Sequence, residues 1–158
     1  MGIEIERKFL LADDSWRAEV VRSTHLVQGY LARTDDTGIR VRIKGDTAEL
    51  NVKKSRDGIE RLEFEYEIPL EDARQMLDEL AARPLIDKTR HIVQRGGHTW
   101  EIDEFHDENL GLVVAEIELA SAAESFERPA WLGREVSTDT RYFNSNLSRN
   151  PYSQWRDD

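Results

Sequence analysis

Paired carboxylates two residues apart recur in this sequence. Glu4 and Glu6 form one pair, and Glu116 and Glu118 form another. Alternate side chains of an extended strand point to the same face, so each pair places two carboxylates side by side. Mg²⁺ takes oxygen ligands and is usually shared between one or two carboxylates and substrate phosphates. The spacing is therefore that of a divalent-cation site.

Cations follow the same spacing. Arg40, Arg42 and Lys44 form one alternating row. Arg binds phosphate oxygens through two hydrogen bonds, and Lys acts as a point charge, so facing rows of cations suit a small polyanion. The candidate phosphate-binding cations lie on polar strand faces and are Lys8, Arg40, Arg42, Lys53, Arg61, Lys88 and Arg90. Lys54 falls on an apolar face, and we expect it to be exposed.

These residues belong to short segments in which polar and apolar side chains alternate, which predicts strands. We expect eight strands, at 3–11, 26–32, 39–44, 47–54, 60–68, 86–94, 98–105 and 112–119. An apolar stripe predicts a helix at 70–82, and shorter helical segments are expected at 12–21, 121–126 and 143–147. The fold class is α+β, mostly β. Eight strands is a number at which an antiparallel sheet closes into a barrel.

The composition sets outer bounds on the function. The chain has 158 residues with a net charge of −10, from 22 Lys and Arg against 32 Asp and Glu, so we expect a single domain, 1–158, that binds no long nucleic acid. The absence of cysteine excludes disulfides, thiol catalysis and Cys-ligated metals. It is consistent with the cytoplasm, where we expect the protein to reside. No apolar run approaches the ~20 residues of a membrane span, and no signal peptide is expected.

Periodicity alone leaves the direction of the polar faces open. An antiparallel sheet commonly buries its apolar face and exposes the other to water. Here, however, cations and anions segregate by strand, and a closed sheet with these faces inward would bring basic rows opposite acidic rows. Such an interior would hold a polyanion and divalent cations, but it is costly unless its charges are paired or bind metal.

The motif Glu4-Ile5-Glu6-Arg7-Lys8 resembles the opening strand of the CYTH family, the triphosphate tunnel metalloenzymes. Further segments resemble the family in the same order, so the resemblance runs from residue 3 to about 150 and is closest to its small single-domain bacterial branch. They are Gln28-Gly29-Tyr30-Leu31, Ile39-Arg40-Val41-Arg42, Val52-Lys53, the acidic strand 61–68, Asp87-Lys88-Thr89-Arg90, Glu101-Ile102-Asp103, Ala115-Glu116-Ile117-Glu118 and the tail 139–144.

The resemblance implies a closed eight-stranded antiparallel β-barrel, or tunnel, with charges inside and a few flanking helices. It also implies hydrolysis of inorganic triphosphate with Mg²⁺ or Mn²⁺. Glu4, Glu6 and Glu118 are the first-choice metal ligands, with Glu116 nearby. Three further carboxylates are expected to complete a second metal site, to hold the basic side chains or to orient water, namely Glu63, Glu65 and Asp103. Because the acidic strand reads Glu-x-Glu-x-Glu at 63–67, the sequence leaves open whether Glu63 and Glu65 or Glu65 and Glu67 form the relevant pair.

The expected reaction is in-line attack of water on a terminal phosphoryl group, which needs mainly positioning and charge neutralisation. Lys88, paired with Lys8 across the tunnel, would serve the phosphate or handle a proton, and Tyr30 would hydrogen-bond to water or phosphate. The alternatives are a nucleoside or thiamine triphosphatase, a class IV-type adenylate cyclase, and a noncatalytic polyphosphate- or nucleotide-binding module. The four His have no metal-binding spacing, and the Trp residues are expected to pack in the core or tail.

Overall fold

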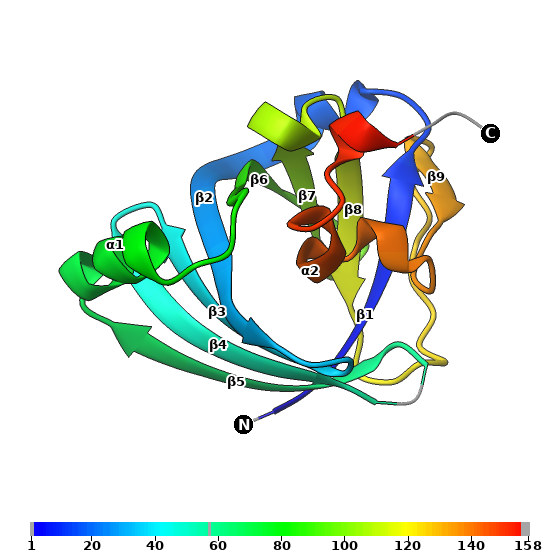
Figure 1. Cartoon of the computed structure of the whole chain (residues 1–158). Helices are drawn as coiled ribbons and strands as arrows, with labels where there is room; N and C mark the ends of the chain where they lie inside the picture. The colour runs from blue at the N-terminus through cyan, green and yellow to red at the C-terminus, as the bar shows by residue number, and fades with distance from the viewer. Residues whose placement is uncertain (1, 57, 156–158) are drawn as a thin grey trace.

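A computed structural model of the chain describes residues 2–56 and 58–155, which build one curved sheet with helical segments around it (Figure 1). The strands are β1 (Gly2–Leu11), β2 (Val20–Arg33), β3 (Thr37–Lys44), β4 (Thr47–Ser55), β5 (Glu60–Ile68), β6 (Ile86–Arg95), β7 (His98–Phe105), β8 (Val113–Glu118) and β9 (Leu132–Glu135). The α-helices are α1 (Leu70–Glu79) and α2 (Asn144–Leu147), and the 3₁₀ segments are η1 (Ser15–Glu19), η2 (Asp107–Asn109), η3 (Thr140–Tyr142) and η4 (Tyr152–Gln154).

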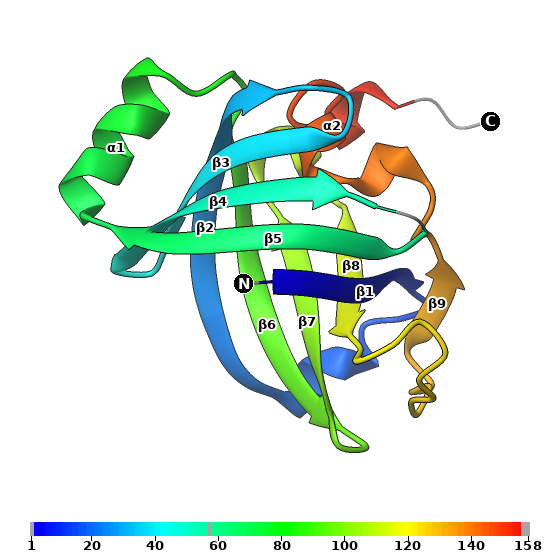
Figure 2. The ribbon, with the colours of Figure 1, turned by 90° about the horizontal axis from the view of Figure 1, so that it is seen from below.

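Strand β1 closes the sheet into a barrel. The strand order is β5-β4-β3-β2-β6-β7-β8-β1-β9, with a further pairing between β5 and β1. The first half of β1 pairs with β5, from Gly2 opposite Glu63 to Ile5 opposite Glu60, and its second half pairs with β8. Figure 2 shows β1 beside β5 at this closure. The predicted eight-stranded antiparallel barrel is confirmed, with β9 added along the far end of β1.

The hydrophobic core lies mainly outside the barrel wall, because the inward strand faces carry the charges. One cluster surrounds Trp16, Trp100 and Trp131 on the outer faces of β1, β7 and β8. A second lies where helix α1 places Ala73 and Leu77 on β3 and β4. The third joins the ends of β6 to β8 to the C-terminal segment and comprises Ile86, Phe105, Leu112, Val114, Val136, Tyr142 and Leu147. The open question of face direction is thereby answered: the polar faces point inward.

Two of the helical segments expected from the sequence were wrong. The helix expected at 12–21 is reduced to the 3₁₀ segment Ser15–Glu19, because β2 begins already at Val20 and pairs with β6. Residues 121–123 form a bend and a turn, and 124–126 are irregular, since Phe126 is anchored against Phe9 and Trp100 and a helix this short is marginal by itself.

Strand β9 (Leu132–Glu135) was not expected, because four residues around a glycine carry little periodic signal. Its approach to β1 depends on Gly133, where a Cβ atom would lie 2.8 Å from the carbonyl oxygen of Leu10. Helix α1 ends at Glu79 rather than at residue 82. Among the described residues, no helix is both long and apolar enough to span a membrane.

Gly29 of β2 lies against the segment that follows helix α1. A Cβ atom here would lie 2.7 Å from Cδ2 of Leu85 and 2.8 Å from Cβ of Ala81. We therefore expect Gly29→Ala to lower the free energy of unfolding by about 1–3 kcal/mol through overpacking. Urea unfolding measures the loss, and an Ala81→Gly background should reduce it. An equal loss in both backgrounds would contradict this account of the contact.

Candidate active site

The barrel encloses a cavity of about 310 Å³ whose described lining is ionisable at every position except one asparagine. Strands β1 and β3 to β8 contribute the charges, and α2 contributes the asparagine. The lining residues are Glu4, Glu6, Arg40, Arg42, Lys44, Glu49, Lys53, Glu63, Glu65, Arg90, Glu101, Glu116, Glu118 and Asn144. The structure thus brings together most of the side chains that the sequence singled out.

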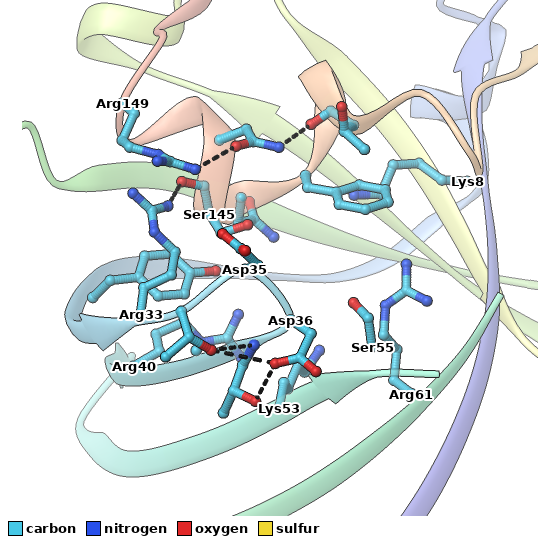
Figure 3. A pocket seen from close by; sticks show the side chains of 18 of the residues that line it. Lys8, Arg33, Asp35, Asp36, Arg40, Lys53, Ser55, Arg61, Ser145 and Arg149 are labelled. Atoms are coloured by element: carbon cyan, nitrogen blue, oxygen red, sulfur yellow. Dashed lines mark hydrogen bonds between the residues drawn. The ribbon is translucent and has the colours of Figure 1, made fainter. Parts of the chain in front are cut away.

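A second cavity, of about 260 Å³, forms the mouth of this tunnel (Figure 3). Lys8, Tyr30 and Arg61 line it together with residues of the C-terminal segment. The two cavities adjoin, because four residues line both of them, namely Glu6, Arg40, Lys53 and Asn144. At the opposite end Glu4, Glu63, Glu65 and Glu118 line an acidic hollow. The tunnel is therefore richer in cations at its mouth and richer in carboxylates at its other end.

The basic wall is built by β3. Arg40 is buried and donates from Nε and Nη2 to Oδ1 of Asn51, at 3.3 and 3.2 Å. Arg42 is bound to Glu49 of β4, and its Nη2 lies 3.6 Å from Oε1 of Glu65. Burial lowers the pKa of Arg42, and the charge of Arg40 beside it acts in the same direction. Two crowded guanidinium groups on one wall attract an anion such as phosphate.

Arg90 and Lys88 share one carboxylate on β6 and β7. Arg90 donates from Nε and Nη2 to the two oxygens of Asp103, at 2.8 and 2.9 Å. The Nζ atom of Lys88 lies 2.7 Å from Oδ2 of Asp103 and donates to Oδ1 of Asn144 at 3.3 Å. Burial lowers the pKa of Lys88 to about 8, although the charge of Asp103 opposes that shift. Asp103 thus holds the basic side chains, one of the three roles that the sequence left open.

Lys8 sits at the mouth on the same inward face of β1 as Glu6. Its Nζ atom lies 3.3 Å from Oε1 of Glu116 and donates to the carbonyl oxygen of Tyr142 at 3.0 Å. Burial opposes ionisation of Glu116, but the charge of Lys8 prevails and lowers the pKa of Glu116 to about 2. Glu116 is therefore an ion-pair partner of Lys8.

Glu6 and Glu63 lie among other carboxyls of the tunnel. Burial, aided by the charge of Glu116, raises the pKa of Glu6 to about 8. Burial and a hydrogen bond with Glu4 raise the pKa of Glu63 to about 9. Lys53 of β4 approaches carboxyls of both β1 and β5, with its Nζ atom 3.1 Å from Glu4 Oε1 and 3.9 Å from Glu63 Oε2. The single charge of Lys53 does not neutralise all of these carboxyls, so a further cation would be bound favourably here.

These carboxylates offer the hard oxygen donors that Mg²⁺ and Mn²⁺ accept. Within residues 2–56 and 58–155, no group of three or more Asp, Glu or His side chains is arranged to hold an ion by itself. That agrees with an ion shared between one or two carboxylates and substrate phosphates. On strand β5, Glu63 and Glu65 line the cavity, and Glu67 is not among its described lining residues.

Several residues of the site were missed by sequence reasoning. Glu49 and Glu101 line the cavity, and Asn51 accepts hydrogen bonds from Arg40. All three lie on the inward faces of predicted strands, so strand parity would have found them. Phe143 and Asn144 come from the C-terminal segment, which no strand pattern places near the tunnel. The Phe143 ring centroid lies 5.1 Å from Cζ of Arg61 and 5.6 Å from Nζ of Lys8. The four His are bonded outside the lining, and three of the four Trp are buried, as expected.

Comparison with known proteins agrees with this geometry. The profile of the CYTH domain matches residues 2–151. The chain belongs to the CYTH family. It is 45% identical over 157 residues to an inorganic triphosphatase of Acetivibrio thermocellus, covering 99% of this chain and 100% of the relative. An inorganic triphosphatase of Nitrosomonas europaea is 34% identical over 149 residues, covering 92% and 96% of the two chains.

Among solved structures of the CYTH fold, a crystal structure of an inorganic triphosphatase superposes on this chain with a TM-score of 0.66 at 32% identity. The superposition covers 94% of this chain and 95% of the other. The closed tunnel is therefore shared with an enzyme that carries that name.

The raised carboxyl pKa values make the stability of the metal-free protein depend on pH. Above about pH 4.5 the unfolded chain loses the proton of Glu6, whereas the folded chain keeps it up to about pH 8. The folded state then binds more protons, so stability falls as pH rises through this window. We expect Glu6→Gln to flatten that slope in urea unfolding between pH 5 and 8. The exposed Glu71→Gln on α1 is the control, and an unchanged slope in Glu6→Gln would contradict the assignment.

Proposed function

We propose that this protein hydrolyses inorganic triphosphate to pyrophosphate and phosphate inside its tunnel. The observation that carries the proposal is the inner cavity, whose described lining consists of ionisable side chains and one asparagine and includes no aromatic ring to stack a nucleobase. A short polyanion without an organic group matches that lining. The curated relatives named inorganic triphosphatases support the same substrate.

We further propose that Mg²⁺ or Mn²⁺ is required. Glu4, Glu6 and Glu118 are the candidate ligands, of which one or two would hold the ion together with substrate phosphates, since all three line the acidic part of the tunnel. Glu63 and Glu65 lie close enough along the same wall to take part. When bound, such an ion neutralises phosphate charge and lowers the pKa of a coordinated water.

The chain's own residues position the substrate in this proposal. Arg40 and Arg42 bind phosphate oxygens from the β3 wall, and Arg90 extends that wall on β6. Lys8, Arg61 and Lys53 bind the part of the substrate nearest the mouth, where Tyr30 donates from its hydroxyl group. Lys88 neutralises charge from behind the lining, next to Asn144. Water then attacks a terminal phosphorus in line with the departing pyrophosphate.

The proposal includes a single domain of residues 1–158, because one continuous sheet carries every candidate cation and carboxylate. A cytoplasmic location stays a prediction.

The second candidate function is hydrolysis of a nucleoside or thiamine triphosphate. It is favoured by the aromatic side chains of Tyr30 and Phe143 at the mouth, against which an organic group would pack.

Purified protein incubated with tripolyphosphate and Mg²⁺ or Mn²⁺ tests the proposed reaction. We expect release of phosphate and pyrophosphate, and loss of activity with a chelator that is restored by added metal. Parallel incubations with ATP and thiamine triphosphate should be slower. Faster turnover of either organic substrate would favour the second function, and cyclic AMP formed from ATP would indicate a cyclase.

Two substitutions separate metal from phosphate binding. Glu6→Ala should abolish most of the metal-dependent rate, because it removes a proposed ligand. Arg42→Ala should mainly raise KM for tripolyphosphate, by about 10–100-fold, because it removes a charged hydrogen-bond donor. Arg74→Ala on the exposed side of α1 is the matched control. Steady-state kinetics measure both effects, and wild-type values in both variants would refute the site.

A further inference from the structure

Asn51 of β4 is fully buried and contacts one cation and one carboxylate of the tunnel lining. Its Oδ1 atom accepts hydrogen bonds from Nε and Nη2 of Arg40, and its Nδ2 atom donates to Oε1 of Glu65 at 3.1 Å. An amide has a donor end and an acceptor end, so the bond to Glu65 fixes the acceptor end against Arg40. Because Asn51 is itself outside the described lining, it can act on a substrate only through the side chains that it holds.

Asn51 is the middle residue of a row that crosses three strands. It lies directly opposite Arg40 on β3 and Glu65 on β5, and opposite residues of antiparallel strands share a face, here the inward one. In the next row on this face, Glu49 takes the place of Asn51 and is bound to Arg42. A neutral amide therefore stands where the adjacent row has a carboxylate.

Arg40 differs from the other buried cations in the partner that holds it. Each of the others in the described part of the chain has a carboxylate within ion-pair distance, and they are Lys8, Arg42, Lys88 and Arg90. Within residues 2–56 and 58–155, no carboxylate lies within ion-pair distance of Arg40, which is bonded to the amide instead. A buried charge without an opposite charge is costly until it binds an anion. Arg40 lines both cavities, so a phosphate group in the tunnel can reach it.

We propose that Asn51 is a positioning residue that holds the Arg40 guanidinium without neutralising it and so sets the affinity of the tunnel for a short polyphosphate. This inference rests on the proposed function. A carboxylate at position 51 would hold Arg40 as firmly but would cancel the charge that attracts the substrate. An apolar side chain would keep the charge but release the guanidinium. The amide meets both needs, because its Oδ1 atom orients Nε and Nη2 while Nη1 donates to a phosphoryl oxygen.

Asn51→Asp keeps the shape of the side chain and places a negative charge beside Arg40. With Mg²⁺ present, we expect the Kd of a nonhydrolysable imidotriphosphate, measured by calorimetry, to rise about 10–100-fold, the scale of one charged hydrogen bond. The KM for tripolyphosphate should rise alike, with kcat nearly unchanged. The melting temperature should stay close to wild type, because the new carboxylate still accepts both hydrogen bonds from Arg40. Asn150→Asp adds the same charge at an exposed site and should bind imidotriphosphate like wild type.

A Glu65→Gln background separates this role from repulsion between neighbouring carboxylates. Asn51→Asp should weaken imidotriphosphate binding by the same factor, within about twofold, in both backgrounds, because its effect passes through Arg40. Four results would overturn the inference and leave the proposed function intact: wild-type affinity in Asn51→Asp, a loss that follows the folded fraction, a loss that disappears with Glu65→Gln, or an equal loss in Asn150→Asp. A wild-type chain that neither binds imidotriphosphate nor releases phosphate from tripolyphosphate would overturn the proposed function and this inference with it.

Discussion

Charges that a closed barrel turns inward must be neutralised by nearby opposite charges, because the interior solvates single ions poorly. The pairing of β1 with β5 imposes this condition, since it completes the ring. Asp103 forms ion pairs with Lys88 and Arg90, and Glu116 forms one with Lys8. The remaining charges are unevenly matched, with Arg40 and Arg42 crowded on one wall. That imbalance makes the interior a binding site rather than a sealed ion-pair network.

The same condition explains where the rest of the chain lies. A barrel filled with charge cannot have its hydrophobic core inside, so the apolar strand faces pack outward under α1, η1 and the loop before β9. The C-terminal segment packs at the end of the barrel formed by β6 to β8, and from there Asn144 reaches both cavities. The net charge of −10 describes the whole molecule and hides the cations collected within it.

Strand parity predicted much of this arrangement. The unbroken alternation from Ile39 to Lys44 predicted a strand with one basic face, and that face lines the tunnel. Whether the face pointed in or out depends on contacts between strands far apart in sequence, such as Glu4 with Arg61, which no local pattern encodes. The resemblance to a known family supplied that information. Neither source placed Asn144 in the lining of the tunnel or predicted that β2 begins at Val20, because both depend on tertiary packing.

The account's central claim is that a short polyphosphate binds inside the barrel, between the β3 cations and the β1 carboxylates. A crystal structure with a nonhydrolysable imidotriphosphate and Mg²⁺ tests it most directly. The account predicts phosphate density inside the tunnel within hydrogen-bond distance of Arg40 and Arg42, with the ion against Glu4 or Glu6. Phosphate density confined to the outer surface, with the tunnel filled by water alone, would contradict it.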